Sequence, residues 1–276
     1  METRLRVMLS AAGAMTACLI LAMTPAAGQA PAYKAPRTPD GKPNLNGIWQ
    51  ANNSANWDVV GHAAAMGSLF QMGAQGATPP GLGVIDGDAL PYIPAAAAKQ
   101  KENYKNRLAL DPEAKCFLPG VPRATYQQHP FQIVQSPETI MMVYEFAGAV
   151  RPIPMKNPGP APAPSWMGWS FGRWEGESLV VDVTGFNDTT WFDRAGNHHS
   201  DALHVVERYT PRSADTMMYE AAIEDGKTYS RPWKMTMPLY RRVERNAQLM
   251  EFKCVEFAEE LMYGHLRKGA PQQKGK

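Results

Sequence analysis

The chain has 276 residues and a formal net charge of +2, with lysines and arginines scattered along it. This length is enough for one sizeable hydrophobic core. The near-balanced charge argues against nucleic acid and anionic membranes as partners.

The first thirty residues have the features of an export signal. Arg4 and Arg6 precede an almost continuous apolar run from Met8 to Met23, and small residues suit cleavage near Gly28 to Ala30. We therefore expect residues 1–30 to be a signal peptide and the mature protein to be periplasmic or secreted. No later stretch of the sequence is long and apolar enough to predict a membrane span.

The region 31–110 is expected to precede the main domain. Residues 31–46 are rich in proline and polar side chains, which indicates an extended arm, and Gly47-Ile48-Trp49 has the character of a strand. Residues 51–94 are rich in Ala, Gly, Met and Pro and predict an irregular insertion. The segment Pro94 to Leu110, with proline in its first turn, predicts the one helix.

Residues 111–262 are predicted to form the β domain, followed by a basic tail at 263–276. Short strand-like segments are separated by turn residues; they cover 131–135, 139–146, 170–174, 178–184, 203–210, 216–224, 233–241 and 249–255. A proline-rich loop is expected at 152–164, and a turn at Glu175-Gly176. This spacing favours a mainly β fold, an antiparallel barrel or sandwich, over a βαβ fold.

Two cysteines, Cys116 and Cys254, remain after removal of the predicted signal. A lone pair in an oxidising compartment predicts a disulfide. A reactive Cys-His pair is the less favoured alternative, because nothing near either cysteine in the sequence is expected to activate a thiol.

Four motifs resemble those of a large group of uncharacterised exported bacterial proteins. They are RTPDGKPNLNGIW from Arg37, DPEAKC from Asp111, GRWEGESLVVD from Gly172, and HSDALHVVERY from His199. The resemblance covers most of the mature chain. It implies that the protein is exported, but it does not imply an activity. The triplet Gly47-Ile48-Trp49 also resembles the Gly-x-Trp of lipocalins, which implies a calycin-like barrel with the tryptophan closing one end.

A polar cluster from Trp191 to Tyr209 is the main candidate site, because it holds three of the six histidines. In an extended chain, alternate residues share a face; this places together His199, Asp201, Leu203, Val205, Glu207 and Tyr209. A histidine beside a carboxylate suits proton transfer near neutral pH. The predicted catalytic set is His199, Asp201, Asp193, His204 and Arg208.

Two alternatives compete with catalysis at this cluster. The histidines and carboxylates could form a structural hydrogen-bond network at a barrel mouth, with Glu207 and Arg208 as cross-strand partners. A zinc or iron site is less favoured, because the spacing fits no standard metal signature and neighbouring histidines in a strand point apart. We predict no metal and no cofactor, since Rossmann, phosphate-loop and His-Glu-x-x-His motifs are absent.

The expected ligand is a small apolar or aromatic organic molecule inside the barrel. The alternation in Trp233-Lys234-Met235 puts a tryptophan and an adaptable methionine on one face; the predicted ligand-binding residues are Trp191, Glu207, Tyr209, Trp233, Met235 and His129. The leading functional hypothesis is cofactor-independent acid–base chemistry of the isomerase, lyase or hydrolase type. A non-catalytic carrier and a structural envelope protein are the alternatives. The sequence does not determine the oligomeric state.

Overall fold

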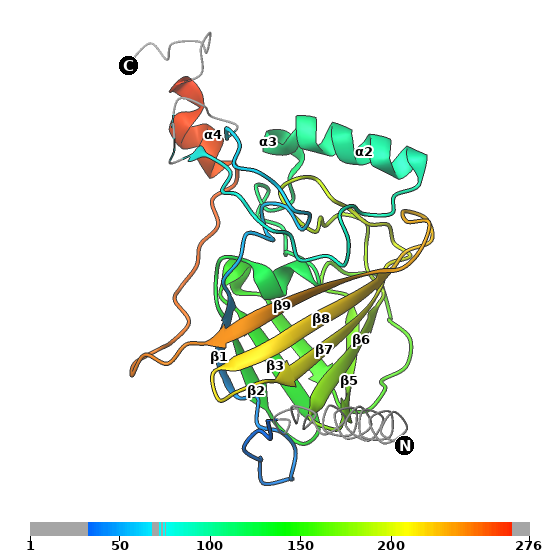
Figure 1. Cartoon of the computed structure of the whole chain (residues 1–276), viewed down its shortest axis with the longest axis vertical. Coiled ribbons are helices and arrows are strands. Elements are labelled where there is room, and N and C mark those ends of the chain that lie inside the picture. Colours follow the sequence, from blue (N-terminus) through cyan, green and yellow to red (C-terminus); the bar gives the residue numbers. More distant parts are fainter. Residues whose placement is uncertain (1–32, 68–71, 73, 75, 267–276) are drawn as a thin grey trace, which may run out of the picture. The chain divides into compact units, whose positions relative to one another are not determined.

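The computed structural model describes residues 33–67, 72, 74 and 76–266 (Figure 1). The predicted signal peptide and most of the basic tail lie outside these residues. The fold is mainly β, as predicted: nine antiparallel strands form a nearly closed barrel in the order β4-β3-β2-β1-β9-β8-β7-β6-β5. The strands are β1 (Gly47–Ala51), β2 (Phe131–Gln135), β3 (Thr139–Tyr144), β4 (Val150–Pro154), β5 (Trp169–Glu175), β6 (Ser178–Thr184), β7 (His204–Pro211), β8 (Thr216–Glu224) and β9 (Trp233–Arg241).

Helices are short in the described part of the chain. The α-helices are α2 (Pro94–Lys105), α3 (Arg107–Leu110) and α4 (Ala258–Tyr263), and single 3₁₀ turns are η2 (Arg123–Tyr126), η3 (Phe146–Gly148) and η4 (Gly264–Leu266). The predicted helix 94–110 is thus present but interrupted at Asn106, whose side chain turns back to the Glu102 carbonyl. None of the helices described is long and apolar enough to cross a bilayer.

The barrel interior follows from the alternation of buried and more exposed residues, which is clearest in β7, β8 and β9. In β7, Val205, Glu207 and Tyr209 are buried, while the residues between them are partly exposed. Strands β8 and β9 repeat the pattern. Because successive side chains of a strand point to opposite faces, this alternation places one face of every strand in a common core.

Strands β4 and β5 meet at the seam of the barrel. Arg151 of β4 donates from Nε to the Ser170 hydroxyl of β5 over 2.9 Å. Gly172 of β5 faces the same seam, where a Cβ atom would lie 3.0 Å from Ile153. Glycine therefore permits the close approach that nearly closes the sheet.

The Gly47-Ile48-Trp49 triplet forms one unit with the end of β9. Trp49 is 1% exposed and donates from Nε1 to the Leu45 carbonyl over 2.9 Å. The Arg241 guanidinium lies 4.2 Å from the centre of its ring. Gly47 has a φ of +135°, which favours glycine, and a Cβ there would lie 2.2 Å from the Arg241 guanidinium, so a larger residue would displace the cation that covers the tryptophan.

Several sequence predictions are corrected by the structure. Strand β4 lies where the proline-rich loop was expected to begin, and β1 pairs with β2 and β9, so the barrel is not confined to residues 111–262. The hairpin turn is Gly176-Glu177, since Glu175 pairs with Ser178. The segment 249–255 is not a strand; it is an irregular stretch whose residues are mostly exposed.

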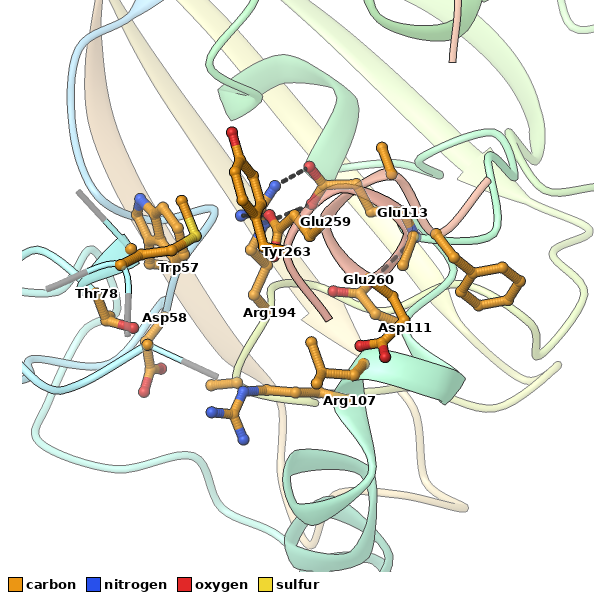
Figure 2. Close-up of a pocket in the computed structure, with 18 of the residues that line it drawn as sticks. Trp57, Asp58, Thr78, Arg107, Asp111, Glu113, Arg194, Glu259, Glu260 and Tyr263 are labelled. Carbon is orange, nitrogen blue, oxygen red and sulfur yellow. Dashed lines mark hydrogen bonds and ion pairs between the residues drawn. The ribbon is translucent and has the colours of Figure 1, made fainter. Parts of the chain in front are cut away.

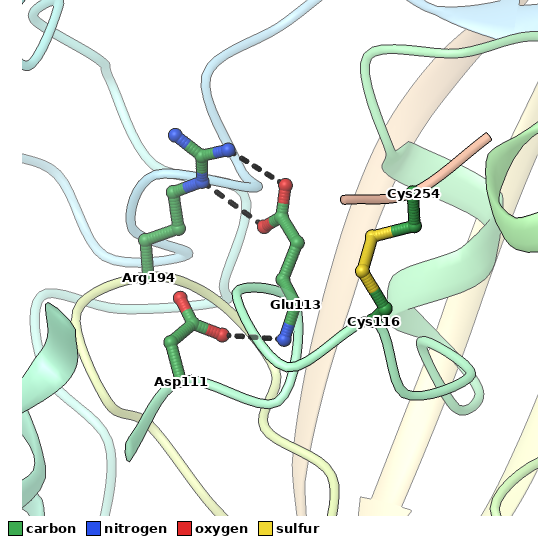
Figure 3. Close-up of a disulfide and its surroundings, with 5 residues drawn as sticks. All are labelled: Asp111, Glu113, Cys116, Arg194 and Cys254. Atoms are coloured by element: carbon green, nitrogen blue, oxygen red, sulfur yellow. Dashed lines mark hydrogen bonds and ion pairs between the residues drawn. A yellow bond between two sulfur atoms is a disulfide. The ribbon is translucent and has the colours of Figure 1, made fainter. Parts of the chain in front are cut away.

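The predicted disulfide between Cys116 and Cys254 is present, with the two Cα atoms 5.6 Å apart (Figure 3). It joins the segment that follows α3 to the irregular stretch before α4. A further backbone bond runs from the Phe257 amide to the Ala114 carbonyl, over 2.8 Å. The C-terminal segment is therefore fastened to residues 114–116 at two points.

Candidate functional site

The predicted histidine cluster is divided among different surroundings. His199 is buried between Phe186 and Phe192. Its Nε2 lies 2.7 Å from the Thr190 hydroxyl and its Nδ1 lies 2.8 Å from the Ser200 carbonyl. The carbonyl can only accept, so Nδ1 carries the proton and Nε2 accepts from the threonine. Burial lowers the pKa of His199, which keeps the ring neutral.

The other polar members of the cluster do not join His199. Asp201 is exposed and pairs with Lys227 over 2.7 Å, so the predicted orienting contact between Asp201 and His199 does not form. His204 and Arg208 lie on the outer face of β7, where they pair with Asp182 and Glu175. The physical reason is that β7 begins only at His204, so the alternation assumed for residues 199–203 does not apply.

Glu207 and Tyr209 lie inside the barrel in a closed polar cluster. Glu207 is 0% exposed; its Oε1 accepts the hydroxyls of Tyr209 and Tyr219 over 2.9 and 2.8 Å, and its Oε2 accepts from Arg151. The carboxylate is thus fully engaged by protein groups. Instead of facing a ligand, it compensates the charge of the buried arginine.

A Gly-x-Ser-x-Gly string, Gly168 to Gly172, occurs in the chain. In serine hydrolases such a serine stands on a sharp strand-to-helix turn. Here Ser170 lies within β5 and its hydroxyl accepts from Arg151. This serine therefore has the surroundings of a residue at the seam between β4 and β5, which differ from those of a serine-hydrolase nucleophile.

The buried core contains side chains from eight of the nine strands, and the partly buried Trp174 of β5 packs against it. Trp233 and Met235 belong to this core, in which the Trp233 ring meets Phe192 edge-on. Trp191 is also buried, next to the barrel core. Of the predicted ligand-binding residues, only His129 lines a different cavity, which is described next.

That cavity, of about 600 Å³, lies outside the barrel, and we call it the outer cavity (Figure 2). Its walls come from described residues between 57 and 67, from Met72, Gly76 and Thr78, from 104–114 around α3, from Arg194-Ala195 and from the C-terminal segment 252–263. The aromatic lining residues are Trp57, Tyr104, Phe146, Phe252, Phe257 and Tyr263; the polar ones include Asp58, His62, Arg107, Glu113, Arg194 and Glu259.

One wall of the outer cavity is built on Glu113 (Figure 3). Arg194 donates to both of its carboxylate oxygens, over 3.0 and 2.7 Å, and the buried Arg123 donates over 2.6 Å. Burial alone would raise the pKa of Glu113, but Arg194 and Arg123 lower it to about 2. The Arg194 guanidinium also covers the Trp57 ring at 4.5 Å. This network fixes the cation and the tryptophan in place.

A second wall carries two carboxyl groups that share one amide. Asn197 Nδ2 lies 2.6 Å from Asp193 Oδ2 and 3.2 Å from Asp58 Oδ1. Asp193 also accepts the Val59 and Asn197 backbone amides, whereas Asp58 lines the cavity. Burial and then the Asp58 charge raise the pKa of Asp193 to about 7; burial likewise raises the pKa of Asp58.

His62 stands next to this pair on the cavity wall. Its Nδ1 lies 2.8 Å from the Val60 carbonyl, which makes Nδ1 the protonated nitrogen and Nε2 an acceptor. Nε2 is buried and has no hydrogen-bond partner within the part of the chain that the structure describes. A ligand hydroxyl or amine could satisfy it.

No metal site emerges from these groups. Nowhere in the described ranges do three His, Cys, Asp or Glu side chains gather closely enough to hold a metal ion. The site is therefore defined by an aromatic cavity, a fixed arginine and a carboxyl pair.

Sequence analysis missed most of the outer cavity. Trp57, Asp58 and His62 fall in the segment expected to be an irregular insertion, and Arg194 was not selected within its cluster. The available signal was local: a Trp-Asp pair and a histidine interrupt a stretch of Ala, Gly and Met. Asp193 was selected, and it lies directly behind the cavity wall.

The fold and the site define a β-barrel protein with a ligand-sized cavity beside the barrel. No protein-family model, curated protein or solved structure matches the chain.

Proposed function

We propose that this is an exported protein, periplasmic or secreted, that binds a small, largely apolar or aromatic organic molecule in the outer cavity. We also propose its membership in the group of exported bacterial proteins whose motifs it resembles. The observation that carries the binding proposal is the cavity itself. Its volume of about 600 Å³ suits a drug-sized ligand, and aromatic rings with a few fixed polar groups are the usual lining of such sites.

The location differs from the one expected from the sequence. The barrel core is occupied by its own side chains, and Glu207 is engaged by three protein donors. The outer cavity instead has groups that a ligand could meet, namely Tyr263, Asp58 and His62. The barrel supports the proposal as a rigid scaffold on which the cavity walls are mounted.

A cavity-filling variant tests the proposal. Ala258 lines the outer cavity, so Ala258→Trp is expected to weaken binding of an environment-sensitive aromatic dye about ten-fold or more, because the new ring takes the ligand's volume. Ala98→Trp is the matched control: the same change at an exposed position of α2, outside the cavity, should leave binding unchanged. Equal dye affinity in both variants and the wild type would refute the outer cavity as the binding site.

Native mass spectrometry of protein purified from its own compartment gives an independent measurement. A co-purifying organic mass that is lost in Ala258→Trp and kept in Ala98→Trp is the expected result.

Acid–base chemistry on the bound molecule is the second candidate function, of the isomerase, lyase or hydrolase type. One observation favours it: Asp58 is a cavity-lining carboxyl whose pKa burial raises, next to an acceptor nitrogen of His62. Catalysis predicts product formation from the co-purified ligand, and its loss in Asp58→Asn. A carrier predicts unchanged ligand at all times.

A further inference from the structure

Asp58 differs from the other carboxylates of the outer cavity in its hydrogen bonds. The Val60 amide and the Asn197 side chain both donate to Oδ1, over 2.9 and 3.2 Å. No ion pair reaches Asp58 from any lysine or arginine of the described chain. Oδ2 is therefore the oxygen that remains for a ligand.

The cations of the cavity are already engaged elsewhere. Arg194 is held by Glu113 in a two-bond pair and stacks on Trp57. Arg107 lies 4.2 Å over the Tyr104 ring and donates to the Tyr104 carbonyl. A ligand that enters the cavity thus meets Arg194, whose charge Glu113 compensates, and Arg107, which is held by Tyr104. It also meets the carboxyl group of Asp58, which no lysine or arginine of the described chain pairs with.

We propose that the outer cavity takes ligands that combine an aromatic or apolar body with a protonated amine, and that the amine binds Asp58. This inference rests on the proposed binding function and adds the charge of the ligand. An ammonium group donates strong, charge-assisted hydrogen bonds to a carboxylate. An aromatic face such as that of Tyr263, which lines the cavity with Asp58 in Figure 2, also attracts cations.

The carboxyl pair makes such binding proton-linked. Asp193 and His62 are the titratable groups nearest Asp58, Tyr92 faces the pair through Asn197, and Arg194 and Arg107 stand across the cavity. Burial raises the pKa of both Asp58 and Asp193, so the pair retains protons at a pH where exposed carboxylates have lost them. An amine at Asp58 stabilises the ionised form and expels a proton, and its affinity falls as the pH decreases.

A matched pair of probes tests the inference: 2-(1-naphthyl)ethylamine and the neutral 2-(1-naphthyl)ethanol, in titrations near neutral pH. In the wild type the amine is expected to bind about ten-fold more tightly, the scale of one hydrogen bond to a charged group. Asp58→Asn should abolish the preference and leave alcohol binding within about two-fold, since the amide keeps the shape of the side chain.

Glu259→Gln is the control for net charge. It removes one negative charge from the same cavity, but Glu259 has a side chain that is 60% exposed and paired with Arg194 over 3.6 Å. The amine preference should survive in this variant, because solvent screens an exposed charge. Its loss in Glu259→Gln to the same extent as in Asp58→Asn would overturn the assignment to Asp58.

Calorimetry of the wild type in two buffers of different ionisation enthalpy provides a measurement that does not depend on the folding of a variant. Proton release with the amine and none with the alcohol supports the inference, and equal release with both overturns it. Equal affinity for the two probes overturns the inference alone. If neither probe binds and the aromatic dye is also insensitive to Ala258→Trp, the proposed function fails as well.

Discussion

The buried pair between Arg151 and Glu207 gives the sharpest prediction about stability. Both side chains are at most 2% exposed, and Glu207 accepts from Arg151, Tyr209 and Tyr219. Glu207→Gln keeps the shape of the side chain but removes the charge. The guanidinium is then left uncompensated in the barrel, with the Nη1 nitrogen already lacking a partner among the described residues.

The size of the effect follows from this uncompensated charge. Breaking a buried pair by removing one partner costs about 3–5 kcal/mol, and we expect Glu207→Gln to lower the free energy of unfolding by that amount. Arg151→Met should cost less, toward the lower end, because the Glu207 carboxylate keeps the hydroxyl donors of Tyr209 and Tyr219. The double variant has no buried charge left, so its loss should fall short of the summed single losses by about 1–3 kcal/mol.

Urea unfolding of the oxidised protein, followed by tryptophan fluorescence and circular dichroism, measures all four proteins of this cycle. Asp201→Asn is the control: it also removes one carboxylate of an ion pair, but on the exposed surface, and should leave the midpoint unchanged. Additive losses in the double variant would refute the argument, because they would show that the two charges do not compensate each other.

Of three further predictions, two concern the walls of the outer cavity and one concerns the buried His199. Replacing both Cys116 and Cys254 with serine removes a cross-link between residues 138 positions apart, which should lower the free energy of unfolding by up to about 5 kcal/mol in the chain-entropy model. Dye binding should also weaken, because the C-terminal wall of the cavity is released. Urea midpoints measure the first effect and dye titrations the second. Arg194 and Arg123 outweigh burial and hold the pKa of Glu113 at about 2, below its value in the unfolded chain. The ionised group therefore stabilises the fold by about 3 kcal/mol above the unfolded pKa, and this contribution is lost as the pH falls toward 2. Glu113→Gln should be less stable than the wild type at neutral pH and should lose less of its unfolding free energy on acidification, as measured by urea unfolding across this pH range. His199→Ala should lower stability by about 3 kcal/mol, because it leaves a cavity and an unpaired Thr190; full loss of turnover with unchanged unfolding would instead favour the catalytic role predicted from the sequence.

The barrel could be predicted from the sequence because its signal is local. Strands β8 and β9 have the limits expected from the alternation of apolar and polar residues, and Gly-x-Trp correctly marked the first strand. Strand β4 was missed since it contains two prolines, which the seam tolerates because β4 has a paired neighbour on only one side in the ladder. Its Arg151 was missed for the same reason.

The site could not be predicted, because its contacts join segments that lie far apart in the chain. Asp193 was predicted as a catalytic residue that orients His199, whereas the residues that it meets in the structure, Asp58 and Val59, precede it by more than a hundred positions. Nothing in local periodicity reports such a pairing, whereas the segment around His198 and His199 had a strong local signal. The prediction therefore followed the dense cluster of polar residues, whereas the outer cavity is lined by Arg194 of that cluster and by segments that lie far from it in the chain.

The distribution of charge explains why the cavity, and not the barrel, is the better candidate for binding. In the barrel every formal charge is balanced within the core, because an unpaired ion there would destabilise the fold by several kcal/mol. The outer cavity is bounded by segments that are fastened to the scaffold by Arg123, Glu113 and the disulfide, so it can hold a carboxyl group whose compensation is left to a ligand. In the proposed function, the ammonium group of a ligand supplies at Asp58 the ion pair that no lysine or arginine of the described chain makes there.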